Sequence, residues 1–411
     1  MRYTQINPAS TVFLLFSAGL VMLMTPGLAL FYGGMVRRKN VLNTLMLSLI
    51  CLLVVSVQWI LYGYSLSFGP DIGGIIGNLK WVGLRGVGMQ PNTNYAPDVP
   101  HLAFMVFQMM FAVITPALIA GAIVERTNFS AFLLFVLLWS TLVYDPVAHW
   151  VWGKGGWLHK IHILDFAGGL VVHLTSGSSA FSAALLIGKR KDYGKEPLTP
   201  HNIPLTILGT ALLWFGWFGF NAGSSLSAGN LSALAFVNTH ISASAAGLTY
   251  LLMEWIKRGK PTTLGAATGI VAGLVAITPA CGFVAPFSAL LIGLIAGVLS
   301  YYAISLKPRF GYDDSLDVVG VHGANGMWGA LATGLFAEAS LNPGGTNGLF
   351  FGQPLVFLYQ LLSIFVVGTY SFLITFLILK LTGKFVPLRV SNFDEEVGLD
   401  ISSHGENSYY L

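Results

Sequence analysis

The chain has 411 residues, of which 55% are hydrophobic and only 9% are charged. A soluble domain carries about 25% charged residues, so this composition excludes an ordinary soluble enzyme, a disordered chain and a nucleic-acid-binding protein. The formal net charge is +4, from 21 Lys and Arg against 17 Asp and Glu. The two cysteines, Cys51 and Cys281, lie in apolar runs and give neither a disulfide framework nor a metal-ligand spacing. The composition predicts an integral membrane protein.

Eleven apolar runs are each close to the length of about 20 residues that a membrane-spanning α-helix needs. The first run is too long for the apolar core of a signal peptide, so we expect no cleavable signal. We predict an all-α bundle of 11 transmembrane helices over residues 1–385 and a polar tail at 386–411. The predicted spans cover residues 9–34, 41–68, 101–124, 129–150, 162–188, 202–223, 231–256, 263–279, 283–306, 317–338 and 353–382.

The basic residues of the loops predict the orientation. With the N-terminus outside the cell, the inner loops and the tail hold 16 Lys and Arg, and the outer segments hold 5. Basic loops stay preferentially on the cytoplasmic side, so we predict N-out, C-in and an odd number of spans. The 16 inner residues are Arg37, Arg38, Lys39, Arg126, Lys189, Arg190, Lys191, Lys195, Lys257, Arg258, Lys260, Lys307, Arg309, Lys380, Lys384 and Arg389.

Two predicted spans contain the same pattern of ionisable residues. Asp165 precedes His173 by eight residues in the fifth span, and Asp314 precedes His322 by eight in the tenth. Ionisable groups within a span are costly and are usually functional. Each aspartate lies near a helix N-terminus, where a carboxylate caps free N–H groups and complements the helix dipole. The pattern predicts two equivalent histidines near the middle of the bilayer.

The fifth and tenth spans would run in opposite directions. Spans one to five and six to ten would then form an inverted 5+5 repeat, with the eleventh span as an extra helix. Such repeats place a site where the two halves meet, so we expect His173 and His322 to lie together there. No third ligand stands at a fitting offset, and we predict no metal or other cofactor; a metal-dependent membrane enzyme built on the histidines is a remaining alternative.

Aromatic residues gather at the predicted outer ends of the third, fourth and sixth spans. Trp150 and Trp214 are typical of the interfacial belt of membrane proteins. A belt does not explain the segment 220–224, Phe-Asn-Ala-Gly-Ser, in which a large ring is followed by small and polar groups. Ring faces and a hydroxyl acceptor could hold a small cation there, since each cation–π contact contributes about 0.5–2 kcal/mol.

Over nearly its whole length the sequence resembles the ammonium transporter family (Amt/Mep/Rh). The matching stretches are Thr25–Met35, Asp165–Gly169 with His173, Gly216–Ser224 and Asp317–Gly323. The resemblance implies a homotrimer with one pore per subunit in the plasma or inner membrane, transporting ammonium or ammonia, with methylammonium as an analogue. It implies no enzymatic activity.

The resemblance also implies roles for single residues. Trp152 and Ser224, joined by Phe111, match an outer cation-recruitment site, and having both favours the Amt branch. Phe111 and Phe220 match stacked gate rings, and His173 and His322 match the paired histidines of the pore. Asp165 matches an aspartate near the outer vestibule with a chiefly structural role, and Asp314 would be its counterpart in the second half.

The predicted mechanism follows from the cost of moving an ion out of water, on the order of 20 kcal/mol for an idealised ion entering an apolar medium. We expect NH4+ to lose its proton near the gate and to cross as NH3, while the proton either returns outside or passes separately through the histidines; the relay would make transport electrogenic. Two alternatives are an electroneutral NH3 channel and an ammonium sensor acting through the tail. Composition describes 386–411 as a flexible polar tail, and the resemblance implies docking on the inner loops and a PII-type regulatory partner.

Overall fold

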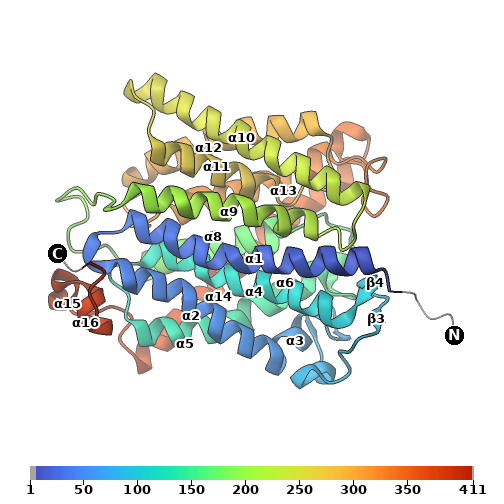
Figure 1. Ribbon diagram of the computed structural model, residues 1–411, viewed down its shortest axis with the longest axis horizontal. Helices are drawn as coiled ribbons and strands as arrows, with labels where there is room; N and C mark the ends of the chain where they lie inside the picture. The colour runs from blue at the N-terminus through green and yellow to red at the C-terminus, as the bar shows by residue number, and fades with distance from the viewer. Residues whose placement is uncertain (1–5, 410–411) are drawn as a thin grey trace.

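The computed structural model describes residues 6–409 as a bundle of helices (Figure 1). The α-helices are α1 (Pro8–Met35), α2 (Val41–Gln58), α3 (Tyr64–Phe68), α4 (His101–Ile123), α5 (Phe129–Trp139), α6 (Asp145–Trp152), α7 (Trp157–Lys160), α8 (Thr175–Ile187), α9 (Ile203–Gly223), α10 (Asn230–Arg258), α11 (Thr263–Ile277), α12 (Pro286–Phe310), α13 (Ala324–Phe336), α14 (Pro354–Phe385), α15 (Asn392–Val397) and α16 (Leu399–His404).

Shorter elements connect or interrupt these helices. The π-helical turns are η2 (Trp59–Gly63), η4 (Ser140–Tyr144), η5 (Gly169–Leu174) and η6 (Val319–Gly323). The 3-10 turns are η1 (Arg38–Asn40), η3 (Leu79–Leu84) and η7 (Leu349–Phe351). Two small antiparallel pairs are formed by β1 (Asp71–Ile72) with β2 (Ile76–Gly77), and by β3 (Pro91–Asn92) with β4 (Ala96–Pro100).

Within residues 6–409, nine helical stretches are long and apolar enough to cross a membrane. They coincide with nine of the predicted spans. The predicted spans 263–279 and 317–338 coincide with α11, which has 15 residues, and with η6 followed by α13. The helical membrane fold is therefore confirmed, and the count of eleven crossings and their orientation stay predictions.

Helices α1 and α9, the first helices of the two predicted halves, pack along each other in opposite directions. The His201 N–H, before α9, donates to the Val36 carbonyl after α1, and the Ala228 N–H, after α9, donates to the Ser10 hydroxyl at the start of α1. Close packing depends on Gly209, where a Cβ would lie only 2.3 Å from the Phe31 nitrogen. Small residues permit this close approach between membrane helices.

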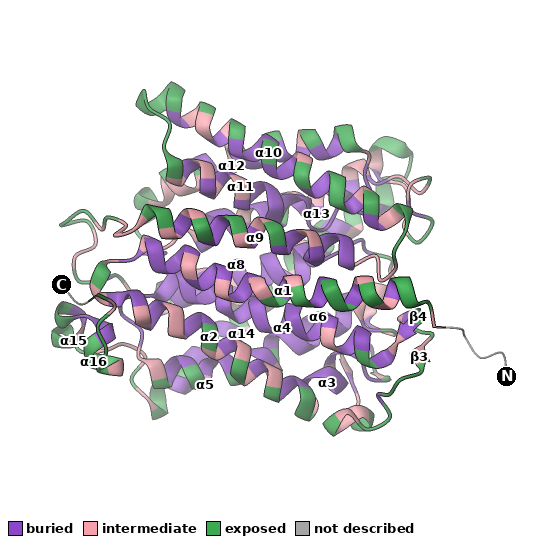
Figure 2. Cartoon of the chain, viewed as in Figure 1, coloured by how far each residue is buried: buried purple, intermediate pink, exposed green. Residues whose placement is uncertain are grey.

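Many large side chains exposed along the helices are apolar; Figure 2 shows exposed positions on the outward sides of α1 and α10. Large exposed hydrophobic side chains include Phe16, Trp255, Leu358 and Phe365. Such a continuous apolar surface is unfavourable in water, so it faces lipid or another apolar surface.

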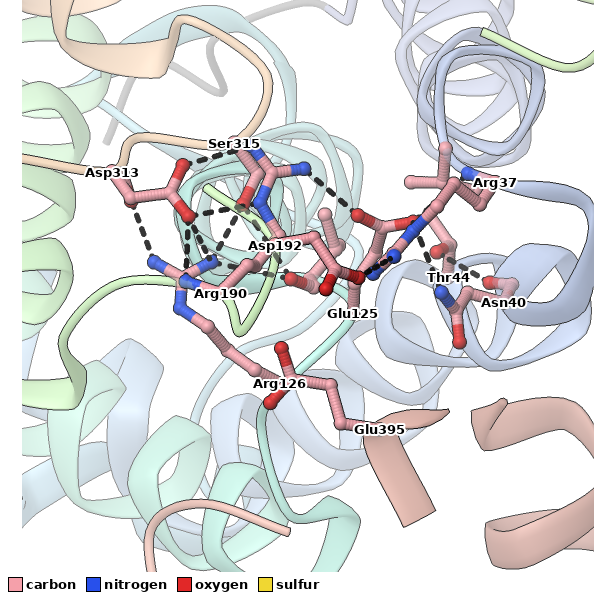
Figure 3. Close-up of polar contacts among 12 residues, drawn as sticks. Arg37, Asn40, Thr44, Glu125, Arg126, Arg190, Asp192, Asp313, Ser315 and Glu395 are labelled. Carbon is pink, nitrogen blue, oxygen red and sulfur yellow. Dashed lines mark hydrogen bonds and ion pairs between the residues drawn. The ribbon is translucent and has the colours of Figure 1, made fainter. Parts of the chain in front are cut away.

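The two ends of the bundle differ, and we name them by their contents. The tail face, at the left of Figure 1, carries α15 and α16; the vestibule face, at the opposite end, carries β3 and β4. Loops following α1, α4, α8 and α12 meet at the tail face through a buried ion network (Figure 3). Glu125 pairs with Arg37 at 3.0 Å and with Arg190 at 2.8 Å, and Arg190 also pairs with Asp313 at 2.8 Å.

The tail docks on this face. The Asp400 carboxylate accepts from the Asn43 N–H at the start of α2 at 2.9 Å. Glu395 accepts from the Lys191 N–H at 2.6 Å and pairs with Arg389 at 2.6 Å. Composition alone predicted a flexible tail, which is wrong for residues 386–409, because tail carboxylates meet N–H groups and cations that the loops supply.

Candidate functional site

A cavity of about 210 Å³, which we call the vestibule, opens on the vestibule face. Its wall includes Trp152 from the last turn of α6, Ser224 at the end of α9, Phe111 from α4, and Asp165. The Ser224 hydroxyl donates to the Phe220 carbonyl at 2.9 Å. Since that bond uses its only proton, the Ser224 oxygen keeps acceptor capacity for a ligand that donates.

Trp152 is fixed in this wall by two contacts. Its indole N–H donates to the Asp165 carbonyl at 2.9 Å. Its ring lies edge-on to Phe111, with centroids 5.9 Å apart and an interplanar angle of 89°. Aromatic faces carry partial negative charge and attract a small cation, so the cavity combines ring faces, a hydroxyl acceptor and a nearby carboxylate.

Phe111 and Phe220 close the bottom of the vestibule. Their ring centroids are 4.2 Å apart with an interplanar angle of 31°, and the two residues are 1% and 0% exposed. Phe111 lines the vestibule, whereas Phe220 lines a second, inner cavity that contains the two histidines. The paired rings therefore separate an open polar cavity from a closed one.

His173 and His322 face each other directly behind these rings. Their Nδ1 atoms are 3.2 Å apart, and both side chains are almost fully buried. An Nδ1–Nδ1 hydrogen bond requires one ring to donate and the other to accept. Two neutral imidazoles bonded in this way must hold different tautomers, so the Nε2 of one ring accepts and the Nε2 of the other donates.

The inner cavity is small and almost entirely apolar. Its volume is about 10 Å³, close to the smallest space that holds a single water, about 10–15 Å³. Around the two imidazoles its wall is made of Met24, Leu28, Phe31, Ile114, Leu118, Val172, Leu213, Trp217, Phe220 and Val271. The His173 Nε2 is buried here without a partner among residues 6–409, so it is free to bond a small polar molecule.

Local backbone structure explains why the histidines meet. His173 lies in η5 and His322 in η6, and such π-helical turns often occur at functional sites. Helix α8, which follows η5, crosses η6 at Gly177 and Gly323, where a Cβ on Gly177 would lie 2.3 Å from the Gly323 Cα. Any larger residue at Gly177 would push the two histidine-bearing segments apart.

Asp165 organises the segment that leads into His173. Its two carboxylate oxygens accept from the N–H groups of four successive residues, 168 to 171, at 2.7 to 3.2 Å. This turn needs a glycine at 168, whose φ of 113° is in the left-handed region that other residues rarely adopt. The carboxylate thus satisfies the free donors at the start of η5.

Asp314 occupies the corresponding place before η6, with a different set of partners. It accepts from the Val319 N–H at 2.7 Å, and its own carbonyl accepts from the Lys307 ammonium at 2.6 Å. Its Oδ1 is buried without a partner among the described residues. Lys307 also pairs with Asp317. Asp314 lies at the tail face, far from the Trp152 and Ser224 group.

Two further residues join the site although the sequence gave them no separate role. Gln108 lines the vestibule, and its Oε1 is buried without a partner within residues 6–409. Trp217 stacks on His173 with centroids 5.4 Å apart, and its indole N–H donates to Thr278 at 3.0 Å. Gln108 stands three residues before Phe111, and Trp217 three residues before Phe220, so each lies on the same helix face as the phenylalanine that follows it.

Comparisons with known proteins agree over nearly the whole chain. The model of the Ammonium Transporter Family matches residues 12–409. An ammonium transporter of Bacillus subtilis is 52% identical over 400 residues, which is 97% of this chain and 98% of the relative. Ammonium transporter Amt1 of Archaeoglobus fulgidus is 47% identical over 403 residues, which is 98% of this chain and 100% of the relative.

Solved structures share the fold. Mep2 of Candida albicans superposes with a TM-score of 0.89 at 34% identity, covering 95% of this chain and 88% of Mep2. A structure described as a sensor Amt protein superposes with a TM-score of 0.89 at 31% identity, covering 98% of this chain and 100% of its own.

Proposed function

Because this chain belongs to the ammonium transporter family, we propose that it recruits NH4+ in the vestibule, removes a proton at the gate and passes NH3 along the histidine pair. The proton follows separately, so transport is electrogenic. Ammonium transporters are not enzymes, which removes the alternative of a metal-dependent membrane enzyme. The observation that carries the proposal is the bonded histidine pair directly behind a closed aromatic gate.

Recruitment relies on groups that accept hydrogen bonds from the four N–H donors of ammonium. Ser224 and Gln108 each offer an oxygen with free acceptor capacity, and Trp152 and Phe111 offer ring faces. The vestibule volume of about 210 Å³ leaves room for a hydrated ion to exchange some of its water for these groups.

Proton loss follows from the size and polarity of the inner cavity. An idealised ion transferred to an apolar interior loses on the order of 20 kcal/mol of solvation, and the apolar wall behind Phe220 offers few oxygens to replace water. Burial disfavours the charged form of an amine, whereas NH3 needs a single acceptor or donor such as the His173 Nε2. Potassium has no proton to lose, so this pore rejects it.

The tautomer requirement of the histidine pair provides the proton route. A proton arriving at the Nε2 that accepts makes an imidazolium, which passes its Nδ1 proton across the 3.2 Å contact to the second ring. The second ring releases a proton from its own Nε2. The pair then holds the reverse tautomers and must reset before the next cycle.

Ammonium-driven current in proteoliposomes, measured on a supported membrane with parallel NH3 flux, tests the proposal. The electrogenic scheme predicts current that saturates with ammonium and no current with potassium. NH3 flux without current would support the electroneutral channel instead.

A sensor function is the second candidate, favoured by the docked tail and by similarity to a protein described as a sensor. Truncation after residue 390 discriminates between the two. A transporter keeps ammonium uptake after truncation or changes it moderately, whereas a sensor shows little uptake in either form.

We also propose the assembly and setting that the family resemblance implies. These are a homotrimer in the plasma or inner membrane, the N-terminus outside and the tail face in the cytoplasm, with residues 386–411 as a separate regulatory segment. A PII-type protein would bind the tail face, and its addition to the purified protein should slow uptake if this partner is correct.

A further inference from the structure

A cavity of about 370 Å³ opens at the tail face, between the loop joining α1 to α2 and the last described residues of the tail. It is separate from the pore and from the vestibule. Three consecutive basic residues, Arg37, Arg38 and Lys39, form one wall, and tail residues including Asp400, Ser408 and Tyr409 form the other. Positive charge in its wall repels a cation such as ammonium, so this cavity suits an anion better than the transported ion.

Arg37 is oriented by its neighbours and keeps one donor unused. Its Nε pairs with Glu125 at 3.0 Å and its Nη1 with Asp192 at 2.8 Å (Figure 3). Its Nη2 is buried and bonds no atom of residues 6–409. A buried N–H without a partner costs free energy, and because this atom is closed to solvent, Arg37 adds positive charge to the wall, whereas Arg38 and Lys39 supply the donors.

Arg38 and Lys39 contact neutral groups. The Arg38 guanidinium lies over the Tyr409 ring, 5.4 Å from its centroid, and the Lys39 ammonium donates to the Glu396 carbonyl. Burial, and after it the charge of Arg37, lower the pKa of Lys39, and nearby carboxylates oppose this shift. The carboxylate in the wall, Asp400, is turned to α2, where it accepts from the Asn43 N–H. The positive charge of the cavity is thus only partly compensated.

We propose that this cavity binds the phosphate group of a phosphate-bearing ligand. Arginine forks match phosphate oxygens, and lysine adds a compact charge. The volume falls within the range of ligand pockets, about 300–1,000 Å³, so the site admits an organic substituent beside the phosphate. The ligand contacts both walls, and its binding therefore stabilises the docked tail by mass action.

The same loop connects the cavity with the inner end of the pore. Arg37 pairs with Glu125, Glu125 with Arg190, and Arg190 with Asp313, which directly precedes Asp314 in the segment that leads to η6. A ligand in the cavity consequently acts on a chain of ion pairs that ends at the histidine-bearing segment.

Two kinds of molecule could supply the phosphate group. One is a lipid headgroup, since basic pockets at the ends of membrane helices bind anionic lipids. The other is a soluble nucleotide. The full-length protein in phosphatidylcholine nanodiscs serves for both arms. In one arm, phosphatidylglycerol is added and bound lipids are counted by native mass spectrometry. In the other, adenosine 5′-monophosphate is titrated by equilibrium dialysis.

The expected result is binding of one probe or both, weakened about tenfold or more in the Arg38→Gln/Lys39→Gln variant, because charge-assisted hydrogen bonds are lost. The matched control is Arg309→Gln, an exposed arginine at the tail-face end of α12, which should bind like wild type. Selective binding of the lipid or of the nucleotide identifies the source.

Absence of binding by both probes, or equal binding by wild type and the double variant, would overturn the proposal. If the double variant does not fold, the single variant Arg38→Gln takes its place in the binding test. Within residues 6–409 the Arg38 side chain contacts only the Tyr409 ring, so this substitution removes a single contact.

Discussion

The two aspartates that precede the histidines have the same spacing and different surroundings. Asp165 accepts four backbone N–H groups and lies beside the vestibule. Asp314 accepts one N–H, keeps a buried oxygen without a partner among the described residues, and lies beside Lys307. The shared spacing sets the π-helical turn and the histidine in both halves. The groups that stabilise each carboxylate differ: backbone N–H dipoles surround Asp165, whereas the Lys307 ammonium lies beside Asp314.

The largest effect should come from Asp165→Ala. The substitution leaves four buried N–H groups without an acceptor, each costing about 1–3 kcal/mol, so we expect a loss of several kcal/mol in stability and loss of methylammonium uptake. The thermal midpoint of the purified protein in detergent and uptake in proteoliposomes measure both. Asp98→Ala, an exposed aspartate on the vestibule face, is the control and should behave like wild type.

Asp314→Ala should be milder than Asp165→Ala. Only one N–H loses its acceptor, and the substitution also removes a buried oxygen that has no described partner, so we expect a loss of about 1–3 kcal/mol. The same two measurements apply. Equal losses for the two alanine variants would contradict the comparison between the halves.

The ion network at the tail face predicts a pH dependence. Burial of Glu125 opposes its ionisation, but Arg190 and Arg37 outweigh burial and lower its pKa to about 2. A lowered pKa in the folded state means stability that is present above the unfolded pKa, about 4.3, and is lost as pH falls toward 2.

Glu125→Gln tests this dependence. The variant should be less stable than wild type by about 3 kcal/mol at pH 7, and the difference should shrink between pH 4.5 and pH 2. Denaturation of the purified protein across this range measures it, with Glu196→Gln, an exposed glutamate of a tail-face loop, as control. A difference that is constant with pH would show that Glu125 is not held ionised by its arginines.

The smallest effects belong to the vestibule acceptors. Ser224→Ala removes one acceptor oxygen and should raise the KM for methylammonium about three- to tenfold with little change in the maximal rate, because one hydrogen bond contributes about 1 kcal/mol. Gln108→Leu should act similarly. Ser227→Ala, whose hydroxyl bonds the Ser225 carbonyl, is the control. An unchanged KM in both vestibule variants would remove these oxygens from the recruitment site.

Much of the fold was predictable because membrane helices depend on local composition. The aspartate–histidine spacing and the opposite directions of the fifth and tenth spans likewise predicted that His173 and His322 lie together. Composition could not predict the docked tail, which only the family resemblance implied, because the N–H donors that hold Asp400 and Glu395 belong to Asn43 and Lys191, more than 200 residues away in the chain. Gln108 was missed since a single polar residue in an apolar helix is ordinary until its unpartnered oxygen is placed in a cavity.

The sequence also could not predict that the two aspartates have different hydrogen-bond partners. Lys307 reaches the Asp314 segment from the end of α12, and the four N–H groups around Asp165 converge only because Gly168 adopts a positive φ. The first feature depends on a contact with a neighbouring helix, and the second on one unusual backbone angle. The spacing of residues in the sequence predicts neither.

The most direct test of the central claim is ammonium-driven current in proteoliposomes containing wild type, His173→Ala, His322→Ala or the double variant. We predict saturable ammonium current and no potassium current in wild type, and loss of the ammonium current or entry of potassium in the double variant. His240→Ala, an exposed histidine of α10, should match wild type. Identical current and ion selectivity in the wild type and the double variant would contradict a proton route through the two imidazoles.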